Sequence, residues 1–162
     1  MNKSIESRVA WLDGYMRGIA ELNGWIREYI AFAYLIERKD VRKSPGELVA
    51  EYYSTQTTLS FSGAEELPGK LGALECDLRN YLVVNVLGMT GDLAKDEILD
   101  RNKYLSFRIM DALSGIIGLK GPCLSVVKLE TEGSDPKTKC TFFCLLFGDF
   151  LLVLQFNQIF YD

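Results

Sequence analysis

The most informative segment of the sequence is residues 139–156, which read KCTFFCLLFGDFLLVLQF. Neither half alternates between apolar and polar residues, so both faces of any strand formed here are apolar and both should be covered. Only Gly148-Asp149 separates the two halves, and glycine at the first central position fits a two-residue type II′ turn. The segment therefore predicts an antiparallel hairpin that is buried on both faces.

The residues around this hairpin extend it to a meander. Three strands are predicted at residues 123–131, 139–147 and 150–161, with the second in the middle. The last strand would form a long apolar edge, and an edge of that kind invites pairing. We expect it to pair with residues 55–62, where apolar positions alternate. Pairing with another chain, by dimerisation or strand addition, is the alternative.

Residues 5–40 are predicted to form one long helix. Apolar residues recur there at steps of three and four along two stripes, and only about a third of the circumference is left polar. Gly14, Gly18 and Gly24 each cost about 1 kcal/mol relative to alanine in a helix. Close helix packing can offset this cost, and a break near Gly24 is the other explanation. The positions expected to be buried are Leu12, Ile19 and Ile26.

The run Ser44-Pro45-Gly46-Glu47 is the clearest helix start in the chain. Ser44 can cap free amides, Pro45 suits the first helical position, and Glu47 completes a capping box. A short helix that includes Tyr52 and Tyr53 should follow.

Three further helical segments are expected later in the chain. Residues 71–82 favour a helix, although residues 81–87 taken alone also fit a strand. Asp92 can cap a second helix, and a third over residues 105–117 is expected to stop at Gly118. The sequence therefore predicts a single α+β domain over residues 1–162, with four or five helices packed on a C-terminal antiparallel meander of three to four strands.

The composition indicates a soluble, cytoplasmic protein. The net charge of −4 argues against nucleic-acid binding, and the longest apolar runs are shorter than the roughly 20 residues of a membrane-spanning helix. No secretory leader is recognisable at the N-terminus. The four cysteines show no disulfide or zinc spacing, so we expect free, buried thiols. The basic cluster at residues 38–43 is interpreted as a solvated helix end.

The absence of histidine is the strongest restriction on chemistry. It excludes Ser-His-Asp and Cys-His catalysis, histidine-bearing zinc sites and imidazole acid–base chemistry. The run Gly115-Ile-Ile-Gly-Leu-Lys-Gly121 resembles a phosphate loop only faintly, because it lacks the Lys-Ser/Thr ending and follows a helix. We therefore expect no metal and no cofactor.

Asp92, Asp96, Glu97 and Asp100 form an acidic stripe in a predicted helix. Carboxylates at this spacing can hold Mg²⁺ or act as acid and base, but lysine and arginine interleave with them as on a solvated face. An acidic docking surface is the functional alternative. We take these four residues as the candidate partner-binding site and assign no catalytic residue.

The aromatic residues of the N-terminal segment allow a second interpretation. They lie at helical spacing, which is typical of core packing, but aromatic side chains also dominate binding hot spots. The residues concerned are Trp11, Tyr15, Trp25, Tyr29 and Phe32.

Acidity, small size and surplus apolar surface together indicate a non-enzymatic protein-binding module. The specific hypothesis is a cytoplasmic inhibitor or immunity-type protein that neutralises another protein, such as a basic toxin domain, by direct binding. The alternatives are a self-associating structural subunit, for instance a homodimer, and an Asp/Glu-dependent enzyme that uses Asp96, Glu97 and Asp100.

Overall fold

The computed structural model describes residues 3–23, 29–82, 95–131 and 138–159. Within these ranges the chain forms four helices and a five-stranded antiparallel sheet, which confirms the α+β class. The elements are α1 (Lys3–Asn23), β1 (Tyr29–Glu37), α2 (Pro45–Tyr53), β2 (Phe61–Glu66), α3 (Leu71–Leu82), α5 (Lys95–Lys120), β3 (Ser125–Thr131), β4 (Thr138–Leu146) and β5 (Phe150–Ile159).

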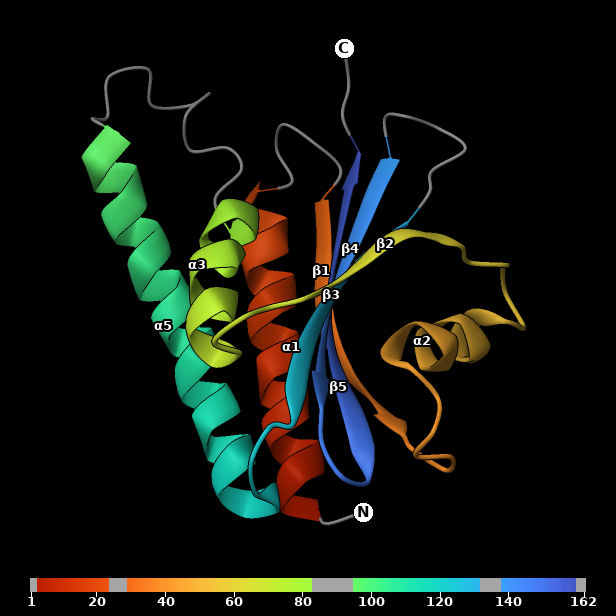
Figure 1. Ribbon diagram of the computed structural model, residues 1–162. Helices are drawn as coiled ribbons and strands as arrows, with labels where there is room; N and C mark the ends of the chain where they lie inside the picture. Colours follow the sequence, from red (N-terminus) through yellow and green to blue (C-terminus); the bar gives the residue numbers. More distant parts are fainter. Residues whose placement is uncertain (1–2, 24–28, 83–94, 132–137, 160–162) are drawn as a thin grey trace.

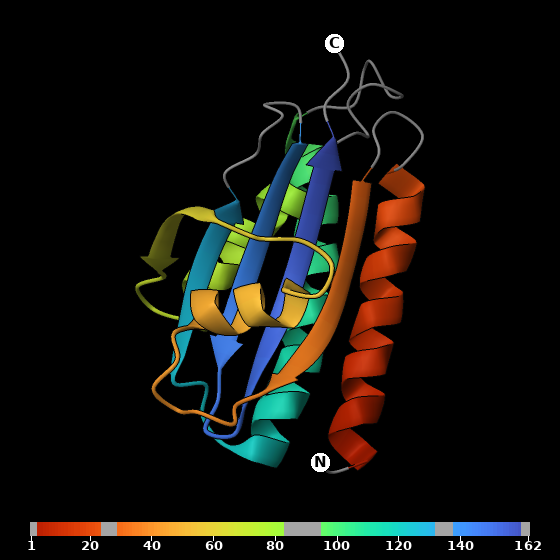
Figure 2. The same cartoon turned by 90° about the vertical axis from the view of Figure 1, so that its right-hand side faces the viewer.

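The sheet lies between two unequal helical layers. Helices α1, α3 and α5 are on one side of it, and α2 lies on the other (Figure 1). Helix α5 packs against α1 and α3 on their outer side. Figure 2 shows α2 crossing the strands at the centre of the opposite face.

The strand order is β1-β5-β4-β3-β2, and every neighbouring pair is antiparallel. The predicted meander of β3, β4 and β5 with β4 in the middle is confirmed. The sheet is larger than a C-terminal meander, because β1 pairs with β5 and β2 pairs with β3. The expectation that β5 pairs within the chain is correct, but its assignment to residues 55–62 is wrong.

The prediction of one helix over residues 5–40 is wrong. Helix α1 ends at Asn23, and Tyr29–Glu37 is strand β1. Residues 29–37 are apolar at nearly every position, so they satisfy the period of a helix and that of a two-faced strand alike. Pairing with the apolar strand β5 stabilises the strand form. Leu12 and Ile19 are buried as expected, while Ile26 lies outside the described residues.

Both faces of the β4–β5 hairpin are covered, as predicted. Phe143 and Leu154 lie in the large core beneath α1, α3 and α5. Phe142 and Val153 face the other way, into a smaller core with Leu48 of α2. The second face is therefore covered by α2 and not by the first helix.

The capping box at the start of α2 is confirmed. The Glu47 N–H donates to Ser44 Oγ at 3.3 Å, and the Ser44 N–H donates to Glu47 Oε2 at 2.7 Å. After α2, the N–H groups of Gln56 and Thr57 donate to the Tyr53 carbonyl. This turn takes up the residues that were expected to start a strand, so β2 begins only at Phe61.

Two expectations about helix ends need correction. Residues 95–120 form one continuous helix, α5, and Gly118 does not stop it. The helix ends at Lys120, where Gly121 has a φ of +90° and donates its N–H to Ile117 O at 2.8 Å. A left-handed residue just after the last turn is the usual role of glycine. Helix α3 is confirmed, and residues 83–87 lie outside the described part of the chain.

The basic residues after β1 form a turn and not a helix end. Arg38 Nη1 donates to the carbonyls of Phe147 and Gly148, at 2.7 and 3.2 Å. The Arg38 N–H also donates to Asp149 O at 3.0 Å. These hydrogen bonds connect Arg38 to the backbone of the β4–β5 turn. The turn has the predicted two residues, but Gly148 lacks the positive φ that type II′ requires.

In the described ranges, no helix is long and apolar enough to cross a membrane. All four cysteines are free thiols, as expected. Cys123 and Cys144 are buried, Cys140 is partly buried, and Cys76 is exposed, contrary to the expectation of burial.

Substituting alanine for Gly14 or Gly18 is expected to raise the free energy of unfolding by about 0.5–1 kcal/mol each. Both glycines are exposed in α1, and no atom lies within 4 Å of a Cβ added there. Urea unfolding measures the effect. Gly121→Ala is the matched control, because its φ of +90° should make alanine destabilising. A loss of stability in both α1 variants would contradict the exposed orientation of this helix face.

Candidate functional site

The acidic stripe is placed only in part. Asp92 lies outside the described residues, and Asp96, Glu97 and Asp100 fall in the first turns of α5, where the structure describes the backbone alone. Their role in binding a partner therefore stays a prediction. Within the described ranges, no three carboxylate or cysteine side chains are grouped so that they could hold a metal ion.

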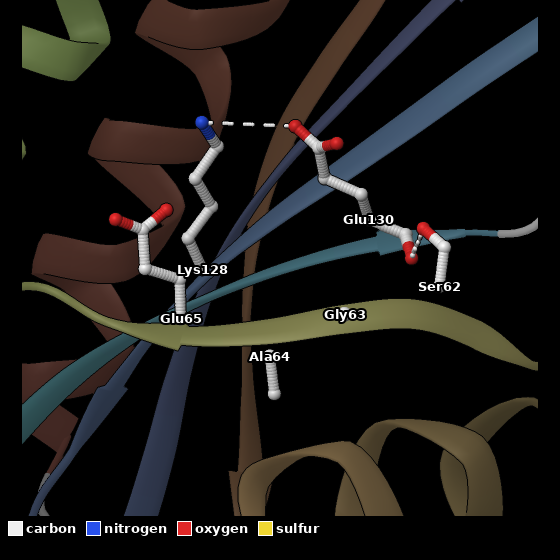
Figure 3. Close-up of a pocket in the computed structure, with 6 residues that line it drawn as sticks. All are labelled: Ser62, Gly63, Ala64, Glu65, Lys128 and Glu130. Carbon is white, nitrogen blue, oxygen red and sulfur yellow. Dashed lines mark hydrogen bonds and ion pairs between the residues drawn. The ribbon is translucent and has the colours of Figure 1, made fainter.

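A depression with a volume of about 420 Å³ lies at the β2–β3 end of the sheet. Figure 3 shows Lys128 and Glu130 of β3 beside β2, with Ala64 pointing to the opposite face. Lys128 Nζ lies 3.5 Å from Asp77 Oδ2 and 3.6 Å from Glu130 Oε1, and Lys139 Nζ lies 2.9 Å from the same Glu130 oxygen. Of the charged residues that line this depression, Lys128 and Glu130 are thus paired, with each other and with Asp77 and Lys139.

The pKa shifts of Lys128 and Glu130 favour the charged form of both side chains, as an ion pair requires. Burial disfavours the charged form of Lys128, but the nearby Tyr81, Asp77 and Glu130 outweigh it and raise the lysine's pKa. Burial similarly opposes ionisation of Glu130, yet Lys139 and Lys128 lower its pKa. A lysine that acts as a nucleophile needs a lowered pKa, so Lys128 is poorly suited to covalent catalysis.

A polar cluster lies beneath α2. The hydroxyls of Tyr34 and Tyr53 both donate to Gln155 Oε1, at 3.1 and 2.7 Å, and Gln155 Nε2 donates to Asn157 Oδ1 at 2.9 Å. Burial raises the pKa of both phenols, that of Tyr34 very strongly. Both phenols therefore stay neutral near pH 7, and the cluster acts as a structural hydrogen-bond network within the sheet face.

The seam between α1 and α5 carries exposed aromatic and arginine side chains. The rings of Trp11 and Tyr15 stack with centroids 5.3 Å apart and planes 7° apart. The Arg108 guanidinium lies 5.7 Å from the centroid of the Trp11 ring. A depression of about 210 Å³ beside them is lined by Arg8, Trp11, Arg108, Asp111 and Ala112. The stack is therefore held in place next to a concave surface.

Three large aromatic side chains of α1 and α5 are open to solvent. Trp11 is 46% exposed, Phe107 is 59% exposed and Tyr104 is 64% exposed. Tyr104 and Phe107 are three residues apart on α5, so they are neighbours on its surface. We call the following set the aromatic surface: Arg8, Trp11 and Tyr15 of α1, and Tyr104, Phe107 and Arg108 of α5.

The sequence identified this surface only in part. Trp11 and Tyr15 were candidates for either core or contact, and the structure makes Trp11 half-exposed. Tyr104 and Phe107 were not singled out. Both fall outside the apolar stripe of α5, and this position in the pattern could have indicated that they are exposed. Among the other aromatic candidates, Trp25 lies outside the described residues, and Phe32 belongs to β1.

The chain was compared with known protein families, curated proteins and solved structures, and it matches none of them. Its function is therefore inferred from the residues and geometry described above.

Proposed function

We propose that this protein is a non-enzymatic protein-binding module and that the aromatic surface is its contact site. The observation that carries the proposal is the exposure of Trp11, Tyr104 and Phe107, with Arg8 and Arg108 lining a depression beside Trp11. Tryptophan, tyrosine and arginine are enriched in the residues that dominate binding energy at interfaces. Exposed side chains of this size also leave apolar area that a partner can remove from water.

The rigidity of the surface supports the same function. Trp11 contacts both Tyr15 and Arg108, and both supporting helices are anchored in the large core through Leu12 and Ile109. A contact site that is ordered before binding loses less conformational entropy when the partner arrives.

The titrating groups give less support to an enzyme. Burial and hydrogen bonding move pKa values away from neutrality: those of Tyr, Cys and Lys side chains rise, and those of Asp and Glu side chains fall. Burial, for example, raises the pKa of the Cys123 thiol, and hydrogen bonds from Arg42 lower that of Asp40. Acid–base catalysis instead needs groups whose pKa values lie near the working pH.

Within this class we propose an inhibitor or immunity-type protein of the cytoplasm. Such a protein acts by occupying its partner, so it requires a stable fold with a rigid contact surface and no reactive group. Self-association through the same surface is the second candidate, and the experiment below separates the two.

Trp11→Ala combined with Phe107→Ala is expected to weaken partner binding at least tenfold, because hot-spot truncations typically cost about 2 kcal/mol or more. The tagged full-length chain is exposed to extract of its host, and the retained proteins are quantified by mass spectrometry. Tyr52→Ala is the matched control, since Tyr52 is a 49% exposed aromatic residue on α2, across the sheet.

Urea unfolding should show that both variants remain folded. Equal retention by the double variant and the control would remove the aromatic surface from the interface. A dimer that is detected by light scattering and lost in the double variant would instead favour the self-associating subunit.

A further inference from the structure

The two edges of the sheet differ in how they are closed. At the β1 edge, α1 lies alongside the strand, and Asp13 Oδ1 accepts the Ala33 N–H at 3.0 Å. At the other edge, β2 pairs with β3 on one side, and no described strand pairs with it on the other. Residues 62–66 are exposed, so no helix or loop of the described chain covers this edge. One edge of the sheet is therefore open.

The register identifies which backbone groups point outward. Leu67 N–H donates to Val126 O at 2.9 Å, which makes this a hydrogen-bonded pair. Hydrogen-bonded and non-hydrogen-bonded pairs alternate along an antiparallel ladder, and Glu65 lies opposite Lys128 two residues away. Glu65 thus faces β3 with its backbone groups, while those of Ala64 and Glu66 face away. The register is regular from Gly63 to Glu66, because the irregularity lies between Phe61 and Gly63.

The charge beside this open edge is negative. Glu65 and Glu66 are exposed, and neither forms a salt bridge within the described ranges. The neighbouring cations are already engaged, Lys128 with Asp77 and Glu130, and Lys139 with Glu130. The depression shown in Figure 3 lies next to this edge and is lined in part by Gly63, which has no side chain to fill it. A segment that pairs here therefore meets uncompensated carboxylates and free space.

We propose that the outer edge of β2 binds an extended, basic segment of another protein by strand addition. The N–H and C=O groups of Ala64 and Glu66 pair with the backbone of that segment, and its lysine or arginine side chains lie near Glu65 and Glu66. A second copy of β2 fits less well, because it would bring a second pair of carboxylates to the same edge. This inference uses a surface separate from the aromatic surface and does not depend on it.

The probe is a fluorescent ten-residue peptide in which lysine alternates with valine and threonine, and its counterpart carries glutamate in place of lysine. The full-length chain should bind the lysine peptide at low salt and bind the glutamate peptide at least tenfold more weakly. Binding should slow amide hydrogen exchange at Ala64 and Glu66, because their N–H groups become hydrogen-bonded.

Two variants test the geometry. Ala64→Pro removes an outward N–H and leaves the β2–β3 hydrogen bonds in place, so it should weaken binding of the lysine peptide at least tenfold. Glu65→Lys combined with Glu66→Lys should do the same through charge. Glu6→Lys combined with Glu21→Lys is the matched control on the exposed side of α1 and should leave binding unchanged.

Several results would overturn the proposal. They are absence of binding, equal binding of both peptides, unaltered exchange at Ala64 and Glu66, or an equal effect of both charge variants. A dimer of the free chain that disappears in Ala64→Pro would show that a second copy occupies the edge instead. If Ala64→Pro fails to fold, the exchange data and the two charge variants still decide the question.

Discussion

Replacing either Phe142 or Phe143 by alanine is expected to lower the free energy of unfolding by about 3–5 kcal/mol. The two residues are neighbours in β4 but face opposite sides of the sheet. Phe142 is 1% exposed and packs edge-on against Phe61, while Phe143 is fully buried between Tyr81 and Phe156. In a sheet with one solvated face, one of two adjacent positions would tolerate alanine. In this sheet neither position should tolerate alanine, because both faces are buried.

Urea unfolding of both variants measures this difference. Tyr104→Ala serves as the control, because Tyr104 is 64% exposed and its truncation should cost less than about 1 kcal/mol. A loss below about 1 kcal/mol for Phe142→Ala would show that the face beneath α2 is not a core, and the same result for Phe143→Ala would contradict the packing of α3 on the sheet.

Replacing Gln155 by leucine is expected to cost about 2–4 kcal/mol of stability. Gln155 is 4% exposed, and its Oε1 accepts the hydroxyls of both Tyr34 and Tyr53. Leucine has a similar volume but leaves both partly buried hydroxyls without this acceptor, and a polar group that is buried without a partner costs about 1–3 kcal/mol. The free energy of unfolding at neutral pH is the measurement.

A compensating variant separates hydrogen bonding from packing. Tyr34→Phe and Tyr53→Phe added to Gln155→Leu should recover much of the loss, because removing both partners of a buried hydrogen bond is far less costly than removing one. If the triple variant is no more stable than Gln155→Leu, the cost comes from leucine packing and not from unpaired hydroxyls.

Features fixed by neighbouring residues were predictable from the sequence. The capping box needs only Ser44 and Glu47, and both hydrogen bonds form as expected. The β4–β5 hairpin follows from two apolar runs separated by two residues. In each case the interacting groups are close in sequence, so local preferences and the observed structure agree.

Features fixed by distant residues were not predictable. Residues 29–37 fit a helix or a strand by their own pattern, and only pairing with β5 decides between them. At the turn, Gly148 O likewise accepts a hydrogen bond from Arg38, which approaches from another part of the chain. The aromatic surface was equally ambiguous, because spacing alone cannot tell an exposed Trp11 from a buried one.

The position of β1 beside β5 has a consequence for synthesis on the ribosome. The two strands are more than a hundred residues apart in the chain, and β5 is the last of the described strands to emerge. Until then β1 is an apolar strand with no partner, and pairings of such large sequence separation form slowly. Unpaired apolar strands are prone to aggregate while they wait. In a nascent chain of this protein, β1 can therefore complete its pairing only after residues 150–158 have left the exit tunnel.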